Sequence, residues 1–205
     1  MEAASVLLIS GGVDSVTLLH QLVGAGEPTV ALFIDYGQRA ARHERGAAQM
    51  HCEAVGVELV EFDLAAIGAM FRDRQERKLH LPMPHRNLVA LALAVSFATN
   101  QGAPRVLLAV NREDTTAYPS ASHAFFAQLR LVYGLIGTVQ LSTPFIDRTK
   151  AEVIARGGAL GIDYSTTYSC MLGHARHCGR CAQCKQRRAA FAAPGIAEDA
   201  DFYHS

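Results

Sequence analysis

The chain has 205 residues, of which half are hydrophobic, so it can bury one substantial core and carry a small appended segment. Lys plus Arg and Asp plus Glu each total 19, so the overall charge does not indicate a protein that wraps nucleic acid or lies on an anionic membrane. No apolar run reaches the roughly 18 residues of a membrane span, and the N-terminus lacks the features of a signal peptide. We therefore expect a globular protein of the cytoplasm.

Short apolar runs alternate with stretches of helical periodicity through the first 160 residues. The expected strands are 6–9, 30–34, 57–62, 106–110 and 139–143, and the expected helices are 15–23, 43–55, 87–99, 123–133 and 150–160. This order predicts an α/β fold, an open and mostly parallel sheet with helices on both faces. The charged stretch 63–84, which closes with two prolines, indicates an excursion over the surface that can serve as a lid.

The first strand is followed by Ser10-Gly11-Gly12-Val13-Asp14-Ser15. The two glycines let the backbone approach an anion, the two serines offer hydroxyl groups, and the helix dipole adds partial positive charge. Asp14 would repel a phosphate unless a cation lies between them, which indicates Mg²⁺. The loop matches neither the Walker pattern nor GxGxxG. The alternative is an ordinary left-handed turn with a helix cap.

The composition changes at about residue 162 to cysteine, histidine, arginine and glycine, which predicts a domain at 1–161 and a small module at 162–205. The spacing C-x7-C-x2-C-x2-C places four thiolates at Cys170, Cys178, Cys181 and Cys184. Four thiolates satisfy tetrahedral Zn²⁺ completely, so we expect a structural zinc site and not a catalytic one. His174 or His177 in place of one cysteine, or an iron–sulfur cluster, are the alternatives.

The loop at 10–15 resembles the SGGxDS loop of the pyrophosphatase-type (PP-loop) ATP enzymes, which cleave ATP between the α and β phosphates to adenylate a substrate. Other motifs occur in an order similar to that of the 7-cyano-7-deazaguanine synthase family. They are DYGQR at 35–39, RN at 86–87, ED at 113–114, YP at 118–119, PFIDRTKAEV at 144–153 and YSC…CGRCAQC at 168–184. The resemblance covers nearly the full chain.

This resemblance implies an ATP-dependent ligase that adenylates the carboxylate of a deazaguanine, 7-carboxy-7-deazaguanine, and transfers it to ammonia, giving an amide and then the nitrile. It also implies a homodimer. The loop at 10–15 would hold the pyrophosphate of ATP, and Lys150 would bring a movable positive charge, oriented by Asp147. Asp14, Lys150 and Asp147 are thus the candidate catalytic residues.

Three further residues would contact ligands if the resemblance holds. Asp35 would reach a ribose hydroxyl, and Arg86 and Asn87 would contact the nucleotide or the substrate. Asp35 and Asn87 also have a structural alternative, because Asp35 can cap a turn and Asn87 can cap a helix. Asp147 and Lys150 can equally form an ordinary, solvated helix start.

Two segments depart from the family pattern. The chain has YPSAS at 118–122 where the family usually reads YPDCR, and His85 where the family usually has glycine. Such changes can redirect specificity while ATP chemistry is kept, so a second reading attaches the deazaguanine to an amine of a partner protein. A third reading has the cysteine module and its arginines bind tRNA, although the balanced charge disfavours nucleic acid. A degenerate, purely structural relative is the last alternative.

Overall fold

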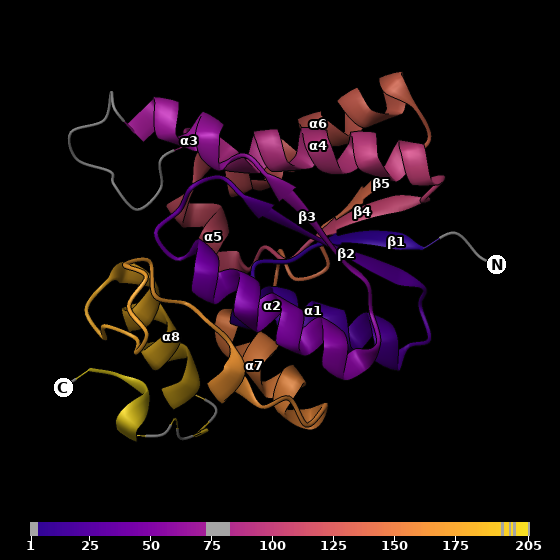
Figure 1. Cartoon of the computed structure of the whole chain (residues 1–205). Coiled ribbons are helices and arrows are strands. Elements are labelled where there is room, and N and C mark those ends of the chain that lie inside the picture. The colour runs from indigo at the N-terminus through magenta and orange to yellow at the C-terminus, as the bar shows by residue number, and fades with distance from the viewer. Residues whose placement is uncertain (1–3, 73–82, 194, 197, 199, 205) are drawn as a thin grey trace.

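The computed structural model describes residues 4–72, 83–193, 195, 196, 198 and 200–204. Its centre is a five-stranded parallel sheet with the strand order β3-β2-β1-β4-β5 (Figure 1). The strands are β1 (Ser5–Leu8), β2 (Thr29–Asp35), β3 (Leu59–Asp63), β4 (Arg105–Leu108) and β5 (Gln140–Ser142). The predicted open parallel sheet is confirmed, with strand ends within two residues of those expected.

Helices cover both faces of the sheet (Figure 1). One face carries α1 (Val13–Gly24), α2 (Ala41–Val55) and α7 (Lys150–Ala159), and the other carries α4 (Arg86–Gln101) and α6 (His123–Ile136). Successive side chains of a strand point to opposite faces of the sheet, which explains this arrangement. Leu7 and Phe33 pack into the apolar cluster under α1 and α2, whereas Val6 and Leu32 pack into the cluster under α4 and α6. Both faces of the central strands are therefore buried.

Three α-helices were not expected from the sequence, two short ones in the α/β part and one, Ala182–Ala192, in the C-terminal segment. The helix α3 (Ala65–Arg72) lies inside the stretch predicted as a surface excursion, and α5 (Arg112–Ala117) follows β4. The first packs closely, since a Cβ on Gly68 would lie 1.9 Å from the carbonyl oxygen of Tyr36. The second is polar throughout and is held by a capping box between Asn111 and Asp114. The remainder of the expected lid, 73–82, lies outside the described residues.

The C-terminal segment contains η2 (Tyr164–Thr166), α8 (Ala182–Ala192) and η3 (Ala200–Phe202). It packs beneath α1 and α7, where Tyr164 and Phe191 share one apolar cluster with Val16 and Ile154. The segment thus completes a common core with the α/β part of the chain. Within the described residues, no helix combines the length and the apolar character needed to cross a bilayer.

Candidate active site

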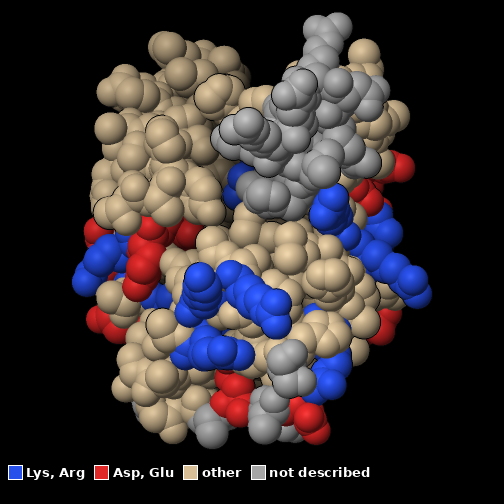
Figure 2. All heavy atoms as spheres, turned by 90° about the vertical axis from the view of Figure 1, so that its left-hand side faces the viewer, with Lys and Arg blue, Asp and Glu red and all other residues tan. Residues whose placement is uncertain are grey.

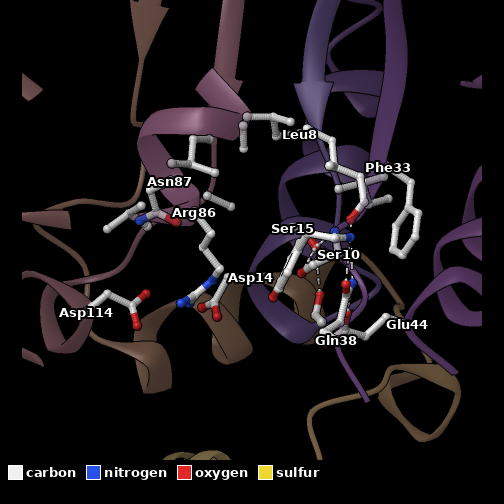
Figure 3. Close-up of a pocket in the computed structure, with 18 of the residues that line it drawn as sticks. Leu8, Ser10, Asp14, Ser15, Phe33, Gln38, Glu44, Arg86, Asn87 and Asp114 are labelled. Atoms are coloured by element: carbon white, nitrogen blue, oxygen red, sulfur yellow. Dashed lines mark hydrogen bonds between the residues drawn. The ribbon is translucent and has the colours of Figure 1, made fainter. Parts of the chain in front are cut away.

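A pocket of about 280 Å³ opens at the carboxyl ends of β1, β2 and β4. The strand order reverses between β1 and β4, and in open α/β sheets ligands bind at such a reversal. The loop after β1, the start of α4 and the residues after β4 surround the pocket (Figure 3). Predicted site residues from distant parts of the chain are thereby brought together.

The loop after β1 forms the floor of the pocket. The backbone N–H of Ser10 donates to Ser15 Oγ at 3.2 Å, the two hydroxyl oxygens lie 3.3 Å apart, and Ser15 Oγ donates to the Gly12 carbonyl at 3.2 Å. Gly12 is the N-cap of α1 and has no side chain to satisfy the first N–H groups of the helix. These groups and the helix dipole make the loop suited to an anion.

The two glycines of this loop have different structural roles. Gly11 has a φ of 69°, and a Cβ there would lie 2.3 Å from the Glu44 carbonyl oxygen of α2. A Cβ on Gly12 would come no closer than 3.4 Å to Ser10 Oγ, on the pocket side. Glycine is therefore needed at position 11 because α2 packs against the loop, and the role of Gly11 toward an anion stays a prediction.

A buried ion pair joins the loop to α7. The Lys150 ammonium, at the start of α7, pairs with Asp14 Oδ2, and both residues line the pocket. Asn111 Nδ2 donates to Asp14 Oδ1 at 3.2 Å, and Asp114 in turn accepts from the Asn111 N–H. Burial, and after it the charge of Asp14, raises the pKa of Asp114 above its ordinary value. A cation and two carboxyl groups thus converge on the pocket.

Two predicted roles need correction. The Asp147 carboxylate is 82% exposed and pairs with His123 Nε2 at 2.9 Å, so Asp14 and not Asp147 holds the Lys150 ammonium. Asp35 accepts from the Gly37 N–H at 2.8 Å and pairs with Arg45 at 2.6 Å. Its carboxylate therefore caps the turn after β2, as the structural alternative for Asp35 predicted. Directly after β2, Tyr36 and Gln38 line the pocket instead.

Arg86 and Asn87 line the pocket as predicted, from the first turn of α4. The Arg86 guanidinium lies 5.6 Å from the centre of the Tyr118 ring, and Asn87 Nδ2 donates to the Ser120 carbonyl at 3.0 Å. Arg86 thus presents its guanidinium to the pocket, whereas Asn87 links α4 to the 118–122 segment by a hydrogen bond. In that segment Tyr118 and Ala121 line the pocket.

Gln38 and Glu44 also line the pocket, and neither was predicted as a site residue. Gln38 Nε2 donates to Glu44 Oε2 at 2.9 Å, and Gln38 Oε1 accepts from the Tyr36 N–H at 2.9 Å. Burial raises the pKa of Glu44 to about 7, although the bond from Gln38 opposes the rise. The motif DYGQR, directly after β2, was the signal that could have indicated Gln38.

The four predicted cysteines converge, and their sulfur atoms all lie within 4.8 Å of one another. The backbone N–H groups of Arg180 and Cys181 donate to Cys178 Sγ at 3.4 and 3.3 Å, and Cys184 N–H donates to Cys181 Sγ at 3.5 Å. Four clustered thiols with N–H donors to sulfur fit a tetrahedral metal.

The two histidines considered as alternative ligands lie outside the sulfur cluster. His177 is buried, and its Nε2 accepts from the Ser169 N–H at 2.8 Å, so this nitrogen is already used. His174 is exposed, and its ring contacts His204 edge to face. The sulfur-only set is the one that the structure assembles.

The parallel sheet, the SGGVDS loop at its reversal point and the pairing of Lys150 with the aspartate of that loop define a PP-loop protein of the ATP-using class. The model of the family described as queuosine biosynthesis protein QueC matches residues 4–195. The chain belongs to this family.

The relatives agree over almost the full length. The chain is 36% identical over 192 residues to 7-cyano-7-deazaguanine synthase 1 of Sulfurisphaera tokodaii, covering 94% of both chains. It is 34% identical over 224 residues to 7-cyano-7-deazaguanine synthase of Brucella ovis, covering 98% of this chain and 96% of the relative.

Solved structures share the fold at low identity. NMN synthetase from Francisella tularensis has a TM-score of 0.57 at 15% identity, covering 97% of this chain and 80% of that one. NH3-dependent NAD synthetase from Campylobacter jejuni has a TM-score of 0.55 at 17% identity, covering 80% and 66%. The U34-tRNA thiolase NcsA from Methanococcus maripaludis, with its [4Fe-4S] cluster, has a TM-score of 0.55 at 14% identity, covering 95% and 65%.

Proposed function

We propose that this protein is an ATP-dependent ligase that adenylates the carboxylate of 7-carboxy-7-deazaguanine and delivers the acyl group to ammonia. The observation that carries the proposal is the anion-binding loop 10–15, whose Asp14 pairs with Lys150 at the pocket, in a chain of the QueC family. Its relatives are named 7-cyano-7-deazaguanine synthases, which supports the nitrile as the final product.

In the proposed reaction, a carboxylate oxygen attacks the α phosphorus of ATP, and the bond to the bridging oxygen breaks so that pyrophosphate leaves with the electron pair. Ammonia then attacks the acyl carbonyl, a proton is lost, and AMP leaves to give the amide. A second ATP activates the amide oxygen in the same way, and loss of AMP and protons gives the nitrile. The loop N–H groups and Lys150 stabilise the negative charge that develops on the pyrophosphate.

Two metals belong to this proposal. Asp14 and Asp114 offer carboxylate oxygens at the pocket, which suit Mg²⁺, and Mg²⁺ bound there would neutralise the phosphate charge. Zn²⁺ would occupy the four-cysteine cluster, where Cys170, Cys178, Cys181 and Cys184 leave no open position for chemistry. We assign this second site to structure.

Ammonia is not the only acceptor that the sequence allows. Three exposed basic residues, Arg180, Lys185 and Arg188, lie on the C-terminal segment. Figure 2 shows basic side chains gathered on the lower half of the face that it draws. A basic surface of this kind suits an acidic partner, either a protein whose amine is modified or a tRNA. We favour ammonia because the relatives are named for the free nitrile.

We also propose a homodimer that forms through α6. Leu131, Leu135 and Ile136 on this helix are 65%, 86% and 65% exposed, an apolar surface of the kind that soluble proteins cover by association. Light scattering should give twice the chain mass for the wild type and the chain mass for Leu135→Lys.

The experiment that tests the function incubates the protein with ATP, Mg²⁺ and 7-carboxy-7-deazaguanine, with and without ammonia, and identifies every product by mass. We expect AMP, pyrophosphate, the amide and the nitrile only when ammonia is present. A mass increase on an added protein would instead support the protein ligase, and absence of AMP under all conditions would refute adenylation. RNA binding in a gel shift would favour the tRNA reading.

A further inference from the structure

The segment 164–171 runs from α7 to the first cysteine of the cluster and passes directly over the anion-binding loop. The backbone N–H of Tyr168 donates to the Gly11 carbonyl at 2.9 Å, and the Tyr168 carbonyl lies 3.5 Å from the Cβ position of Gly12. Ser169 and Met171 line the pocket, and Cys170 between them belongs to the cysteine cluster. The segment therefore touches both the loop and the metal site.

One buried side chain bonds to three residues of this segment. Arg187 of α8 is 1% exposed, and its Nη1 lies 2.8 Å from Thr167 Oγ1 and 3.1 Å from Ser169 Oγ, while Nη2 donates to the Tyr164 carbonyl at 2.7 Å. Its Nε donates to Glu198 at 2.7 Å, within the C-terminal segment. A planar guanidinium fixes several partners at once, which an ammonium cannot do.

The aromatic rings around Arg187 restrict it further. Its guanidinium carbon lies 4.3 Å from the centre of the Phe202 ring and 5.1 Å from that of Phe191. Leaving a buried guanidinium without hydrogen-bond partners costs free energy, so Arg187 keeps its bonds to residues 164–169. The position of this segment over Gly11 thus depends on α8.

We infer that Arg187 is a positioning residue for the phosphate loop, acting through Thr167, Tyr168 and Ser169. This inference rests on the proposed function, because it takes ATP as the ligand of the pocket. Nothing in the chemistry of the reaction requires Arg187 itself, since it lies behind the segment and not among the lining residues. Its loss should therefore loosen the Tyr168–Gly11 contact and weaken ATP binding.

The test measures the Kd of ATP by calorimetry for Arg187→Gln, Arg187→Lys and Thr167→Val, without acid substrate. The matched control is Arg188→Gln, the same substitution at the exposed neighbour on the same helix, which stacks on Tyr203. We expect Arg187→Gln to raise the Kd about tenfold, Thr167→Val and Arg187→Lys about threefold, and Arg188→Gln less than twofold. Metal content and thermal unfolding identify variants that keep the fold.

A second readout needs no ATP. Hydrogen exchange of the Tyr168 amide, which donates to Gly11, should be faster in Arg187→Gln and Thr167→Val than in Arg188→Gln. If a folded, metal-loaded Thr167→Val or Arg187→Gln variant binds ATP like the wild type and protects the Tyr168 amide equally, the inference is wrong. If the wild type itself binds no ATP, the proposed function fails instead, while the exchange data still decide the contact.

Discussion

Lys150 and Asp147 lie three residues apart and in opposite surroundings. The Lys150 side chain is 8% exposed and pairs with Asp14, whereas the Asp147 side chain is 82% exposed. The difference arises because Thr149 caps α7, so that the helix turns the lysine inward while Asp147 stays in the preceding turn. Local sequence offered both residues as candidates, and only the packing separates them.

This difference can be measured. Lys150→Met removes the charge that would stabilise the leaving pyrophosphate and leaves Asp14 unpaired, so we expect pyrophosphate release to slow at least about a hundredfold. Asp147→Asn should slow it less than about threefold, because its carboxylate points to solvent. A coupled pyrophosphate assay with 7-carboxy-7-deazaguanine measures both rates, and thermal unfolding checks the fold. Equal losses in the two variants would restore the role first expected for Asp147.

The packing of α2 against the anion-binding loop depends on Gly11. Gly11→Ala would place a Cβ 2.3 Å from the Glu44 carbonyl and force a left-handed backbone on alanine, so we expect a loss of roughly 3 kcal/mol in the free energy of unfolding. Gly12→Ala, with φ of −83°, should keep the stability and weaken ATP binding instead. Urea unfolding and ATP titration measure the two effects. A stable Gly11→Ala variant would show that α2 can move away.

Two histidines connect α1, α2 and the C-terminal segment by hydrogen bonds. His20 Nε2 lies 3.1 Å from His51 Nδ1, and His51 Nε2 lies 3.0 Å from Thr166 Oγ1. Burial, with a smaller contribution from His20, lowers the pKa of His51 to about 4 from an ordinary 6.5. Between these values the unfolded chain binds more protons than the folded one, so stability falls as the pH falls.

We therefore expect the free energy of unfolding to decrease between pH 6.5 and pH 4, with His51 contributing roughly 3 kcal/mol over the window. His51→Gln should show a shallower decrease, because glutamine does not titrate. Denaturant unfolding at a series of pH values measures the slope, with the exposed His174→Gln as control. Parallel curves for the wild type and His51→Gln would contradict this assignment.

At the scale of the whole molecule, the C-terminal segment contributes to the common core. Tyr168 and the cysteines pack with Ala40 and Ala47 of the α/β part, and Gly173 approaches the Arg39 carbonyl so closely that a Cβ would lie 2.3 Å from it. Disorder in the segment would therefore expose apolar surface on α1, α2 and α7. Metal binding at the cysteines is expected to stabilise the entire chain.

Removal of the metal tests this coupling. We expect one Zn²⁺ per chain, and we expect chelation or Cys184→Ser to lower the unfolding temperature by about 10 °C, equivalent to roughly 3 kcal/mol for this length. Cys52→Ala is the matched control, because Cys52 is buried but lies outside the cluster. Elemental analysis and calorimetry provide the two measurements. Full metal loading of Cys184→Ser would contradict the four-thiolate site, and iron in place of zinc would favour the cluster alternative.

Local patterns were sufficient for the sheet and for most of its helices. Strands buried on both faces leave continuous apolar runs, as at Val6 to Leu8, and long amphipathic helices repeat their apolar residues every three or four positions. The cysteine spacing likewise indicated its own cluster, because ligands separated by two residues converge within one turn of chain. The polar helix α5 carries no such pattern and was missed.

The partners of the site residues followed from contacts between distant segments. Whether Asp14 or Asp147 meets Lys150, whether Asp35 faces a ligand or Arg45, and why Gly11 is glycine all depend on where α2, α7 and the C-terminal segment pack. The pair between Asp14 and Lys150, for example, joins residues 136 positions apart. Periodicity reports only which face of an element is buried, whereas side-chain pairing is set by the packing of elements that sequence spacing does not relate.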